Sequence, residues 1–284
     1  MKMFKWAVRI LLYPTAIFFI ISLIFFYLYS TPKKKTTPVT PSQFGLKYEE
    51  VSAKTEDGIN LSFWFIPNNN SKKGIIMLHG WPADKGDIIT NTFFLSKNYN
   101  LLYLDFRAMG KSEGKFSTGG YLETRDIKTA VGFFKTKGIN DISLYGYSMG
   151  AFTAVIYSIL NDDIKSVVAD SPYDSMHSVL KDFFKFYGFL SAPILWFINL
   201  EYKIIYGKFI TDLSLSKNID RIDKPILILC GNKDDVCYND KLNYYSGRNK
   251  NVDVLILDGF SHNESIYYKN YEKILSDFYD KKFI

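Results

Sequence analysis

The sequence predicts an α/β fold with a mostly parallel sheet, preceded by one membrane-spanning helix. Short apolar runs typical of buried strands alternate with runs typical of helices, and this alternation indicates a largely parallel sheet with helices on both faces. A Gly-x-Ser-x-Gly motif at residues 146–150 joins one such strand to one such helix. Near the start of the chain, residues 10–29 carry no charge.

The composition suits one α/β domain with an appendage, because the chain has 284 residues and 47% hydrophobic content. The net charge of +6 comes from the N-terminus, where the first 35 residues hold six basic side chains and no acid. The remainder is balanced, with 29 basic and 29 acidic residues. Basic charge confined to the N-terminus indicates a membrane partner and gives no support to nucleic-acid binding.

We predict that residues 1–30 form an uncleaved membrane anchor. A helix of about 20 residues spans roughly 30 Å, the thickness of the hydrocarbon core. The alternative is a signal peptide, whose apolar region is shorter and ends in small residues; here the run ends in residues 25–29, which are mostly aromatic. Lysines flank both sides, so the positive-inside rule gives little orientation. A short tail before a large domain favours a single-pass cell-membrane protein with its catalytic domain outside the cytoplasm.

The rest of the chain divides into a linker and a catalytic domain. Residues 31–45 form the linker, which its prolines should keep extended, and residues 46–284 form the domain. Strands are expected at 46–53, 59–66, 74–78, 101–104, 141–145, 166–169, 226–230 and 254–257, the first two joined by a turn at Asp57-Gly58. Helices are expected at about 87–97, 121–137, 151–160 and 263–279.

Residues 173–219 interrupt the alternation of strands and helices. We predict that they form a small helical insertion, a lid, over the sheet. Its aromatic side chains either pack the insertion onto the domain, or line an apolar substrate site or touch the bilayer. Five of them are our candidate substrate-binding residues: Phe183, Phe186, Tyr187, Trp196 and Phe197.

Ser148 is the candidate nucleophile. A tight turn between strand and helix holds such a serine in a strained conformation above the sheet edge, and glycines at 146 and 150 let the neighbouring elements approach. The following helix directs its positive end at the reaction centre. The alternative interpretation is an ordinary serine in a Gly-rich turn.

Serine needs a general base. Of the three histidines, His262 follows the last strand and comes after Ser148 in the expected order, whereas His79 lies in an early turn and His177 opens the insertion. The acid that orients the imidazole should lie between Ser148 and His262. Asp234 and the adjacent Asp235 follow a strand, and Asp170 follows the preceding strand; the residues alone leave these candidates open.

These motifs resemble the α/β-hydrolase superfamily, and in particular its membrane-anchored bacterial members that are similar to Bem46 and serine aminopeptidases. The resemblance covers residue 46 to the C-terminus and rests on six motifs: His79-Gly80-Trp81, Asp105-Phe106-Arg107-x-x-Gly110-x-Ser112, Gly146-x-Ser148-x-Gly150, Asp170-Ser171-Pro172-Tyr173, Gly231-x-x-Asp234 and Gly259-x-x-His262. It implies an α/β-hydrolase fold with an eight-stranded sheet and selects Asp234 as the acid. It also implies an oxyanion hole made by the backbone N–H groups of Trp81 and Met149. Ala108-Met109 departs from the family's usual Gly-His, at a structural turn.

The expected activity is hydrolysis of a small-molecule or lipid-like acyl ester through a Ser148–His262–Asp234 triad and an acyl-enzyme. A serine peptidase is the alternative, because the resemblance includes aminopeptidases, and a non-catalytic membrane-bound module is a further one. We expect no metal and no organic cofactor. Cys230 and Cys237 are expected to form no metal-ligand cluster.

Overall fold

An eight-stranded sheet forms the centre of the computed structural model, which describes residues 2–237, 239–262 and 264–282. Its strand order is β1-β2-β4-β3-β5-β6-β7-β8. β2 is antiparallel to β1 and β4, and the other neighbours are parallel. This confirms the predicted eight-stranded, mostly parallel sheet.

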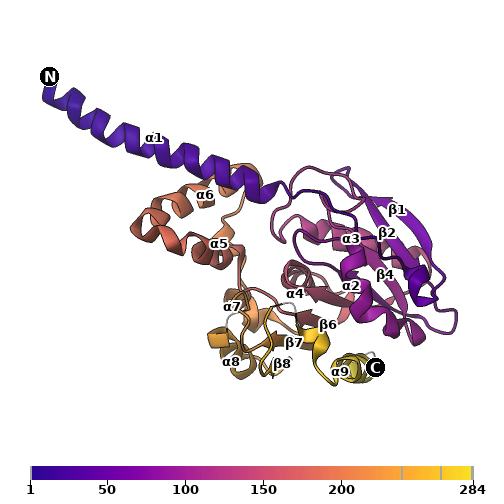
Figure 1. The fold of residues 1–284 in the computed structure, drawn as a ribbon. Coiled ribbons are helices and arrows are strands. Elements are labelled where there is room, and N and C mark those ends of the chain that lie inside the picture. The colour runs from indigo at the N-terminus through magenta and orange to yellow at the C-terminus, as the bar shows by residue number, and fades with distance from the viewer. Residues whose placement is uncertain (1, 238, 263, 283–284) are drawn as a thin grey trace. The chain divides into compact units, whose positions relative to one another are not determined.

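The elements have the following bounds (Figure 1). The strands are β1 (Glu49–Lys54), β2 (Asn60–Ile66), β3 (Lys73–Leu78), β4 (Asn100–Leu104), β5 (Asp141–Tyr147), β6 (Ile164–Asp170), β7 (Ile226–Gly231) and β8 (Val252–Leu257). The α-helices are α1 (Lys2–Ser30), α2 (Lys85–Thr92), α3 (Glu123–Thr136), α4 (Met149–Leu160), α5 (Met176–Phe184), α6 (Ser191–Tyr206), α7 (Leu215–Asn218), α8 (Asn239–Arg248) and α9 (Tyr271–Lys282). Short 3-10 helices are η1 (Pro41–Phe44), η2 (Phe93–Lys97), η3 (Lys185–Leu190), η4 (Ile210–Asp212), η5 (Ile219–Arg221) and η6 (Ser265–Tyr267).

Helices cover both faces of the sheet because the buried strands are apolar on both sides. Ile75 and Met77 of β3 belong to a cluster with side chains of α2 and α9. Successive strand residues point to opposite faces, and at Gly74 the opposite face meets Phe134 of α3, whose ring would lie 2.7 Å from an added Cβ. The loops at the edges of the sheet therefore rise from strands fixed by two apolar layers.

The chain forms two compact units. One contains residues 32–174 and 215–284 and holds the whole sheet; we call it the hydrolase unit. The other contains residues 1–31 and 175–214, that is, α1 together with α5, η3, α6 and η4; we call it the helical unit, and its second segment the insertion. The two ends of the insertion meet in the hydrolase unit, where the Leu215 N–H donates to the Asp174 carbonyl at 2.8 Å.

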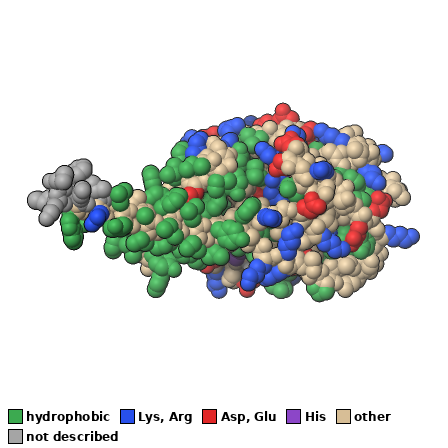
Figure 2. Space-filling view, turned by 90° about the horizontal axis from the view of Figure 1, so that it is seen from above, with side chains coloured by type: hydrophobic (Ala, Val, Ile, Leu, Met, Phe, Trp, Pro, Cys, Tyr) green, Lys and Arg blue, Asp and Glu red, His purple; other side chains and the backbone are tan. Residues whose placement is uncertain are grey.

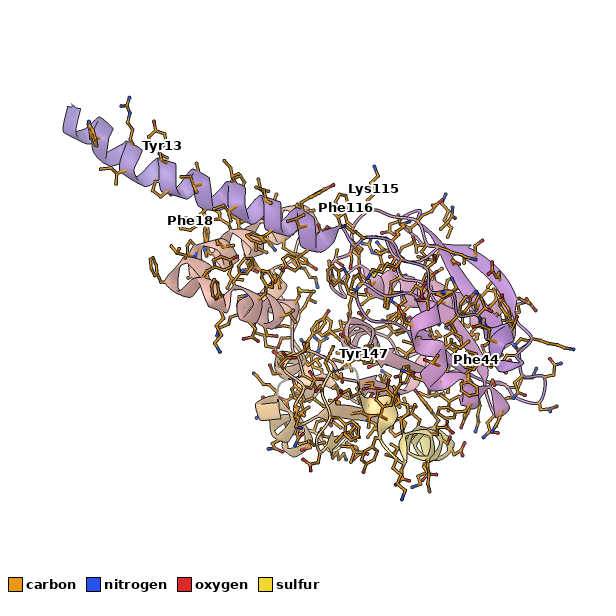
Figure 3. The ribbon with its side chains drawn as sticks, viewed as in Figure 1. Tyr13, Phe18, Phe44, Lys115, Phe116 and Tyr147 are labelled. Carbon is orange, nitrogen blue, oxygen red and sulfur yellow. The ribbon has the colours of Figure 1, made fainter. Side chains whose placement is uncertain are left out.

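The segment after α1 contacts α2 and the 3-10 helix η2 that follows it. The Thr37 N–H donates to Asp84 Oδ2 at 2.6 Å, and the Thr37 hydroxyl donates to Asp87 Oδ1 at 2.9 Å. Asp84 is also the N-cap of α2, so the same acids that begin this helix hold the passing segment. Phe44 stacks on Phe93 at 4.6 Å between ring centroids, beside the hydrolase core (Figure 3). The segment expected to be an extended linker thus makes specific contacts.

The C-terminal helix begins at Tyr271, later than the expected residue 263, which lies outside the described residues. Ser265 and Tyr271 both donate hydrogen bonds to the buried Asp170. These two contacts hold the intervening segment against the sheet in a 3-10 turn, η6, before the helix can start.

Candidate active site

Ser148 lies between the end of β5 and the start of α4, with φ 52° and ψ −113°. A non-glycine residue at positive φ is strained. The surrounding backbone holds it there: the Ser148 N–H donates to the Asp170 carbonyl at 2.8 Å. The sequence-predicted turn thus raises the Ser148 side chain at the carboxyl edge of the sheet, where it lines a cleft.

The two motif glycines allow this close approach. A Cβ on Gly150 would lie 2.2 Å from the Leu78 carbonyl oxygen, and one on Gly146 would lie 2.3 Å from the Gly150 carbonyl oxygen. Both obstacles are backbone atoms, which cannot move aside without displacing β3 or α4.

We expect Gly150→Ala to lower the free energy of unfolding by about 3 kcal/mol or more through overpacking. Gly132→Ala is the matched control: it lies inside α3, where an added Cβ meets nothing within 4 Å. That variant should instead stabilise the protein by about 0.5–1 kcal/mol, because alanine loses less backbone entropy in a helix. Chemical denaturation of both variants measures the difference, and equal midpoints would contradict the close packing of the turn.

The structure brings Ser148, His262 and Asp234 together. His262 Nε2 lies 3.0 Å from Ser148 Oγ, and His262 Nδ1 lies 2.9 Å from Asp234 Oδ2. Because a carboxylate only accepts, Nδ1 carries the proton and Nε2 is left to accept from the serine hydroxyl. The Tyr147 hydroxyl donates to the His262 carbonyl at 2.7 Å and fixes the loop that carries His262.

The turn after β7 gives Asp234 its orientation. Asp234 Oδ1 accepts from the Val236 and Cys237 N–H groups at 2.8 and 2.9 Å. Burial would raise the pKa of Asp234, but the hydrogen bond and charge of His262, with these backbone donors, hold the pKa below its ordinary value. Asp234 is therefore ionised at neutral pH, while the neighbouring Asp235 side chain is exposed.

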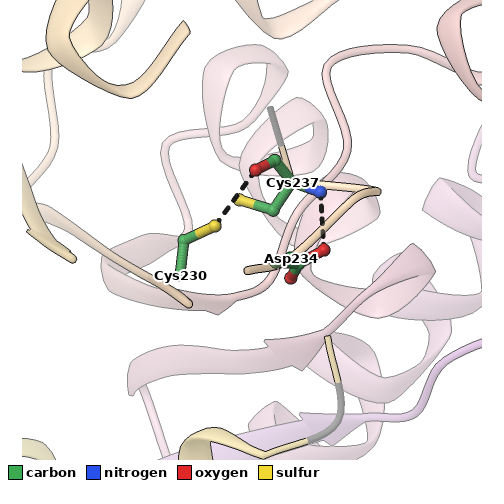
Figure 4. Close-up of side chains that lie close together, drawn as sticks. All are labelled: Cys230, Asp234 and Cys237. Atoms are coloured by element: carbon green, nitrogen blue, oxygen red, sulfur yellow. Dashed lines mark hydrogen bonds between the residues drawn. The ribbon is translucent and has the colours of Figure 1, made fainter. Parts of the chain in front are cut away.

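The same turn corrects the expectation that the cysteines join no ligand cluster. The ligand atoms of Cys230, Asp234 and Cys237 lie within 4.8 Å of one another, close enough to hold a metal ion (Figure 4). The Cys230 thiol lies 3.2 Å from the Cys237 carbonyl oxygen, and burial raises the pKa of the Cys237 thiol. Both carboxylate oxygens of Asp234 already face His262, so these contacts fit an imidazole partner better than a metal.

Asp170, the other candidate acid on an earlier strand, has different hydrogen-bond partners from Asp234. Its carboxyl accepts from Ser265 Oγ, Tyr271 OH and Tyr145 OH at 2.7, 2.9 and 3.1 Å. Complete burial raises the pKa of Asp170, despite these donors. Since Ser265 follows His262 by three residues, Asp170 braces the loop that carries the imidazole.

The turn after β3 lies against the nucleophile. A Cβ on Gly80 would be 3.3 Å from Ser148 Cβ, and Trp81 lines the same cleft as Ser148. His79 is buried; its Nδ1 lies 2.7 Å from the Gly80 carbonyl and its Nε2 accepts from the Phe106 N–H at 3.0 Å. His79 therefore braces this turn. Met149 begins α4, directly after Ser148.

Ser148 and His262 open into a cleft of about 870 Å³ in the hydrolase unit. Apolar or aromatic lining comes from Trp81, Ile88, Tyr147 and Ile266, and residues 35–38 form another part of the wall. Sequence reasoning missed residues 35–38, Ile88 and Ile266; the proline-rich composition of the linker gave no signal of its hydrogen bonds to α2. The five candidate substrate-binding aromatics, Phe183, Phe186, Tyr187, Trp196 and Phe197, belong to the helical unit.

Comparison with known proteins gives consistent matches. The family model for the alpha/beta hydrolase fold matches residues 74–198. Bem46 of Schizosaccharomyces pombe is 25% identical over 208 residues, which cover 69% of this chain and 64% of that protein, less than two thirds of its length. The uncharacterized membrane protein YNL320W of Saccharomyces cerevisiae is 25% identical over 251 residues, or 86% of this chain and 83% of that protein.

Solved structures extend the likeness over nearly the whole chain. The Pyrococcus furiosus esterase Pf2001 superimposes with a TM-score of 0.73 at 25% identity, covering 90% of this chain and 99% of that chain. Sheet order, the strand–serine–helix turn and these matches agree with the resemblance inferred from the motifs. The chain therefore has the α/β-hydrolase fold and is a distant homologue of Bem46-like proteins.

Proposed function

We propose that this α/β hydrolase is a serine esterase, tethered to a membrane, that cleaves carboxylic esters or related acyl bonds. The observation that carries the proposal is the chain of two hydrogen bonds that links Ser148 Oγ to His262 and His262 to Asp234. The likeness to the esterase Pf2001 supports ester substrates.

In the proposed reaction His262 Nε2 takes the hydroxyl proton while Ser148 Oγ attacks the carbonyl carbon. The developing alkoxide accepts from the backbone N–H groups of Met149 and Trp81, which typically contribute about 3–4 kcal/mol each. His262 then gives the proton to the leaving oxygen, and the alcohol departs. Water, deprotonated by His262, then attacks the acyl carbon; the carboxylic acid departs and His262 returns the proton to Ser148 Oγ. Asp234 holds the imidazole in the required tautomer and stabilises the imidazolium.

We propose that the acyl chain lies against the apolar wall of the cleft, where Ile266 is a half-buried side chain. Each buried methylene contributes roughly 0.8 kcal/mol, so removing the Ile266 side chain should lower kcat/KM for hexanoyl esters by about tenfold and leave acetyl esters nearly unchanged. The measurement is a p-nitrophenyl ester series from acetyl to decanoyl on wild type and Ile266→Ala.

Ile256→Ala is a suitable control, since this side chain is exposed on β8. Phe197→Ala tests the alternative site on the insertion. If Phe197→Ala changes the chain-length preference more than Ile266→Ala does, the acyl chain binds at the insertion aromatics and not at Ile266. A flat profile in wild type, with cleavage of aminoacyl p-nitroanilides, would favour a peptidase instead.

We propose that α1 anchors the protein in the cell membrane with the hydrolase unit outside the cytoplasm. Residues 12–30 have a mean hydropathy of 2.0 over a span-length helix, and the relative YNL320W is named a membrane protein. High salt should leave the protein in the membrane fraction, because salt screens charges without weakening apolar burial, whereas detergent should release it. External protease should digest the hydrolase unit in intact cells. Release by salt, or a mature N-terminus near residue 30, would contradict the anchor.

A further inference from the structure

The insertion packs along α1, within the helical unit. Phe197 of α6 meets Phe19 at 5.6 Å between ring centroids, and Phe184 of α5 meets Phe25 at 4.8 Å. Further along, Tyr206 meets Phe26 at 6.2 Å. The insertion therefore lies beside residues 19–29, the part of α1 nearest in sequence to the hydrolase unit, and leaves its N-terminal part uncovered (Figure 1).

A polar pair fixes this packing. The Ser22 hydroxyl of α1 donates to Glu201 Oε1 of α6 at 2.5 Å, and both residues are buried. The buried side of α6 repeats at helical spacing, with Ile194, Ile198 and Glu201 in line. Glu201 thus points at α1, where its Oε1 accepts from the Ser22 hydroxyl, while its buried Oε2 has no hydrogen-bond partner among the described residues.

The helical unit is apolar on its exposed side as well. On α1, the exposed apolar side chains include Ile20, Leu23, Ile24 and Leu28. On the insertion, Phe186, Phe189 and Trp196 are 92%, 87% and 60% exposed. Figure 2 shows hydrophobic side chains crowding the surface of this unit. Helices that are apolar all round are typical of a membrane environment.

Residues 176–206 are long and apolar enough to be a second candidate membrane span, but the insertion does not form one continuous helix. Gly188, at φ 55° and ψ −131°, breaks the helical run between α5 and α6, and α6, the longer of the two with 16 residues, is shorter than the roughly 20 residues that a span needs. Its two ends also leave the hydrolase unit together at Asp174 and Leu215. The insertion is a helical hairpin that returns to the side from which it starts.

We propose that this hairpin enters the bilayer leaflet next to the hydrolase unit and contacts lipid acyl chains beside α1. The inference rests on the proposed anchoring by α1. If α1 spans the membrane, the residues that Phe19 and Phe25 contact lie at acyl-chain depth, because the insertion covers α1 over residues 19–29. The exposed aromatics of the insertion then continue the lipid-facing surface of α1 without interruption.

The charged residues of the hairpin are distributed as expected for this depth in the bilayer. No charged residue occurs between Phe186 and Leu200, the segment that includes the Phe197 contact with the middle of α1. Lys203 lies in the last turn of α6 and Lys208 just after the helix, near the Tyr206 contact with Phe26. Lysine and tyrosine are typical of the membrane–water interface. A protein partner would not require this match with depth along α1, so the observations favour lipid.

Tryptophan quenching by lipids brominated in the acyl chains tests the proposal on the full chain in vesicles. The double variant Trp6→Phe, Trp196→Phe provides the background emission of Trp64 and Trp81. Trp6→Phe alone then reports Trp196 on the insertion. Adding Ile20→Trp to the double variant reports α1, and adding Tyr267→Trp reports an exposed site of the hydrolase unit.

We expect the emission of Trp196 to fall by a similar fraction to that of the Ile20→Trp reporter, while the Tyr267→Trp reporter is unchanged. Loss at the Ile20→Trp reporter without loss at Trp196 would overturn the proposal and leave a protein partner or a second copy to cover the hairpin. If neither reporter loses emission, both the membrane anchoring by α1 and the insertion of the hairpin are contradicted. Esterase activity of the same vesicles is a separate readout, so failure of the hydrolase assignment remains distinguishable.

Discussion

Ser148→Ala and His262→Ala are each expected to abolish p-nitrophenyl ester hydrolysis. Ser148 supplies the nucleophile and His262 moves every proton in the proposed reaction, so loss of either leaves only the oxyanion donors and substrate binding. Removal of one such residue costs on the order of 10⁶ in kcat. The measurement is kcat for a short-chain ester with each purified variant.

Both variants should retain the wild-type thermal unfolding profile, because the Ser148 and His262 side chains contact each other at the edge of a cleft and fill no core position. Ser158→Ala is a matched serine control on the buried side of α4, outside the cleft. Substantial activity in Ser148→Ala would contradict the proposed nucleophile.

Asp234→Asn is expected to lower kcat by about 10⁴, the cost of holding the imidazole in the wrong tautomer. An amide can donate to Nδ1, which would place the proton on Nε2 and prevent it from accepting the serine proton. Asp235→Asn is the matched control, adjacent in sequence but exposed, and should change kcat little. Steady-state kinetics of the two variants separate the neighbouring carboxylates.

Asp170→Asn extends this test to the earlier strand. Its carboxyl accepts from Ser265 and two tyrosines, so we expect lower stability with a smaller loss of kcat than in Asp234→Asn. If Asp170→Asn loses more kcat than Asp234→Asn at equal stability, the acid lies on β6. If Asp235→Asn is the more damaging change, the assignment is wrong by one residue.

The sheet and the serine turn could be predicted from the sequence because their determinants are local. Apolar strand runs and helix patterns alternate in the order that the sheet requires, and the glycines at 146 and 150 mark a turn where a Cβ would meet backbone atoms. The choice of Asp234 as the acid could not be made from the residues alone, because they left three aspartates as candidates. The backbone donors of Val236 and Cys237 turn Asp234 towards His262.

The features that could not be predicted from the sequence depend on contacts between segments that are distant along the chain. Aromatic density indicated an insertion, but the composition could not show that Phe184 and Phe197 pack against α1, more than 150 residues earlier. The hydrogen bonds of Thr37 to the cap of α2 are likewise invisible in a proline-rich segment. Cys230 and Cys237 come together with Asp234 only because the loop after β7 folds back on itself.

The central claim is that Ser148 is an activated nucleophile, and labelling with a fluorophosphonate tests it most directly. Native protein in its membrane should react at Ser148, as located by peptide mass spectrometry. Heat-denatured protein and the His262→Ala variant should react far more slowly, because the reagent reports a hydroxyl that a base has activated. Failure of the native protein to label, labelling at another serine, or equal labelling of native and His262→Ala protein would contradict the account.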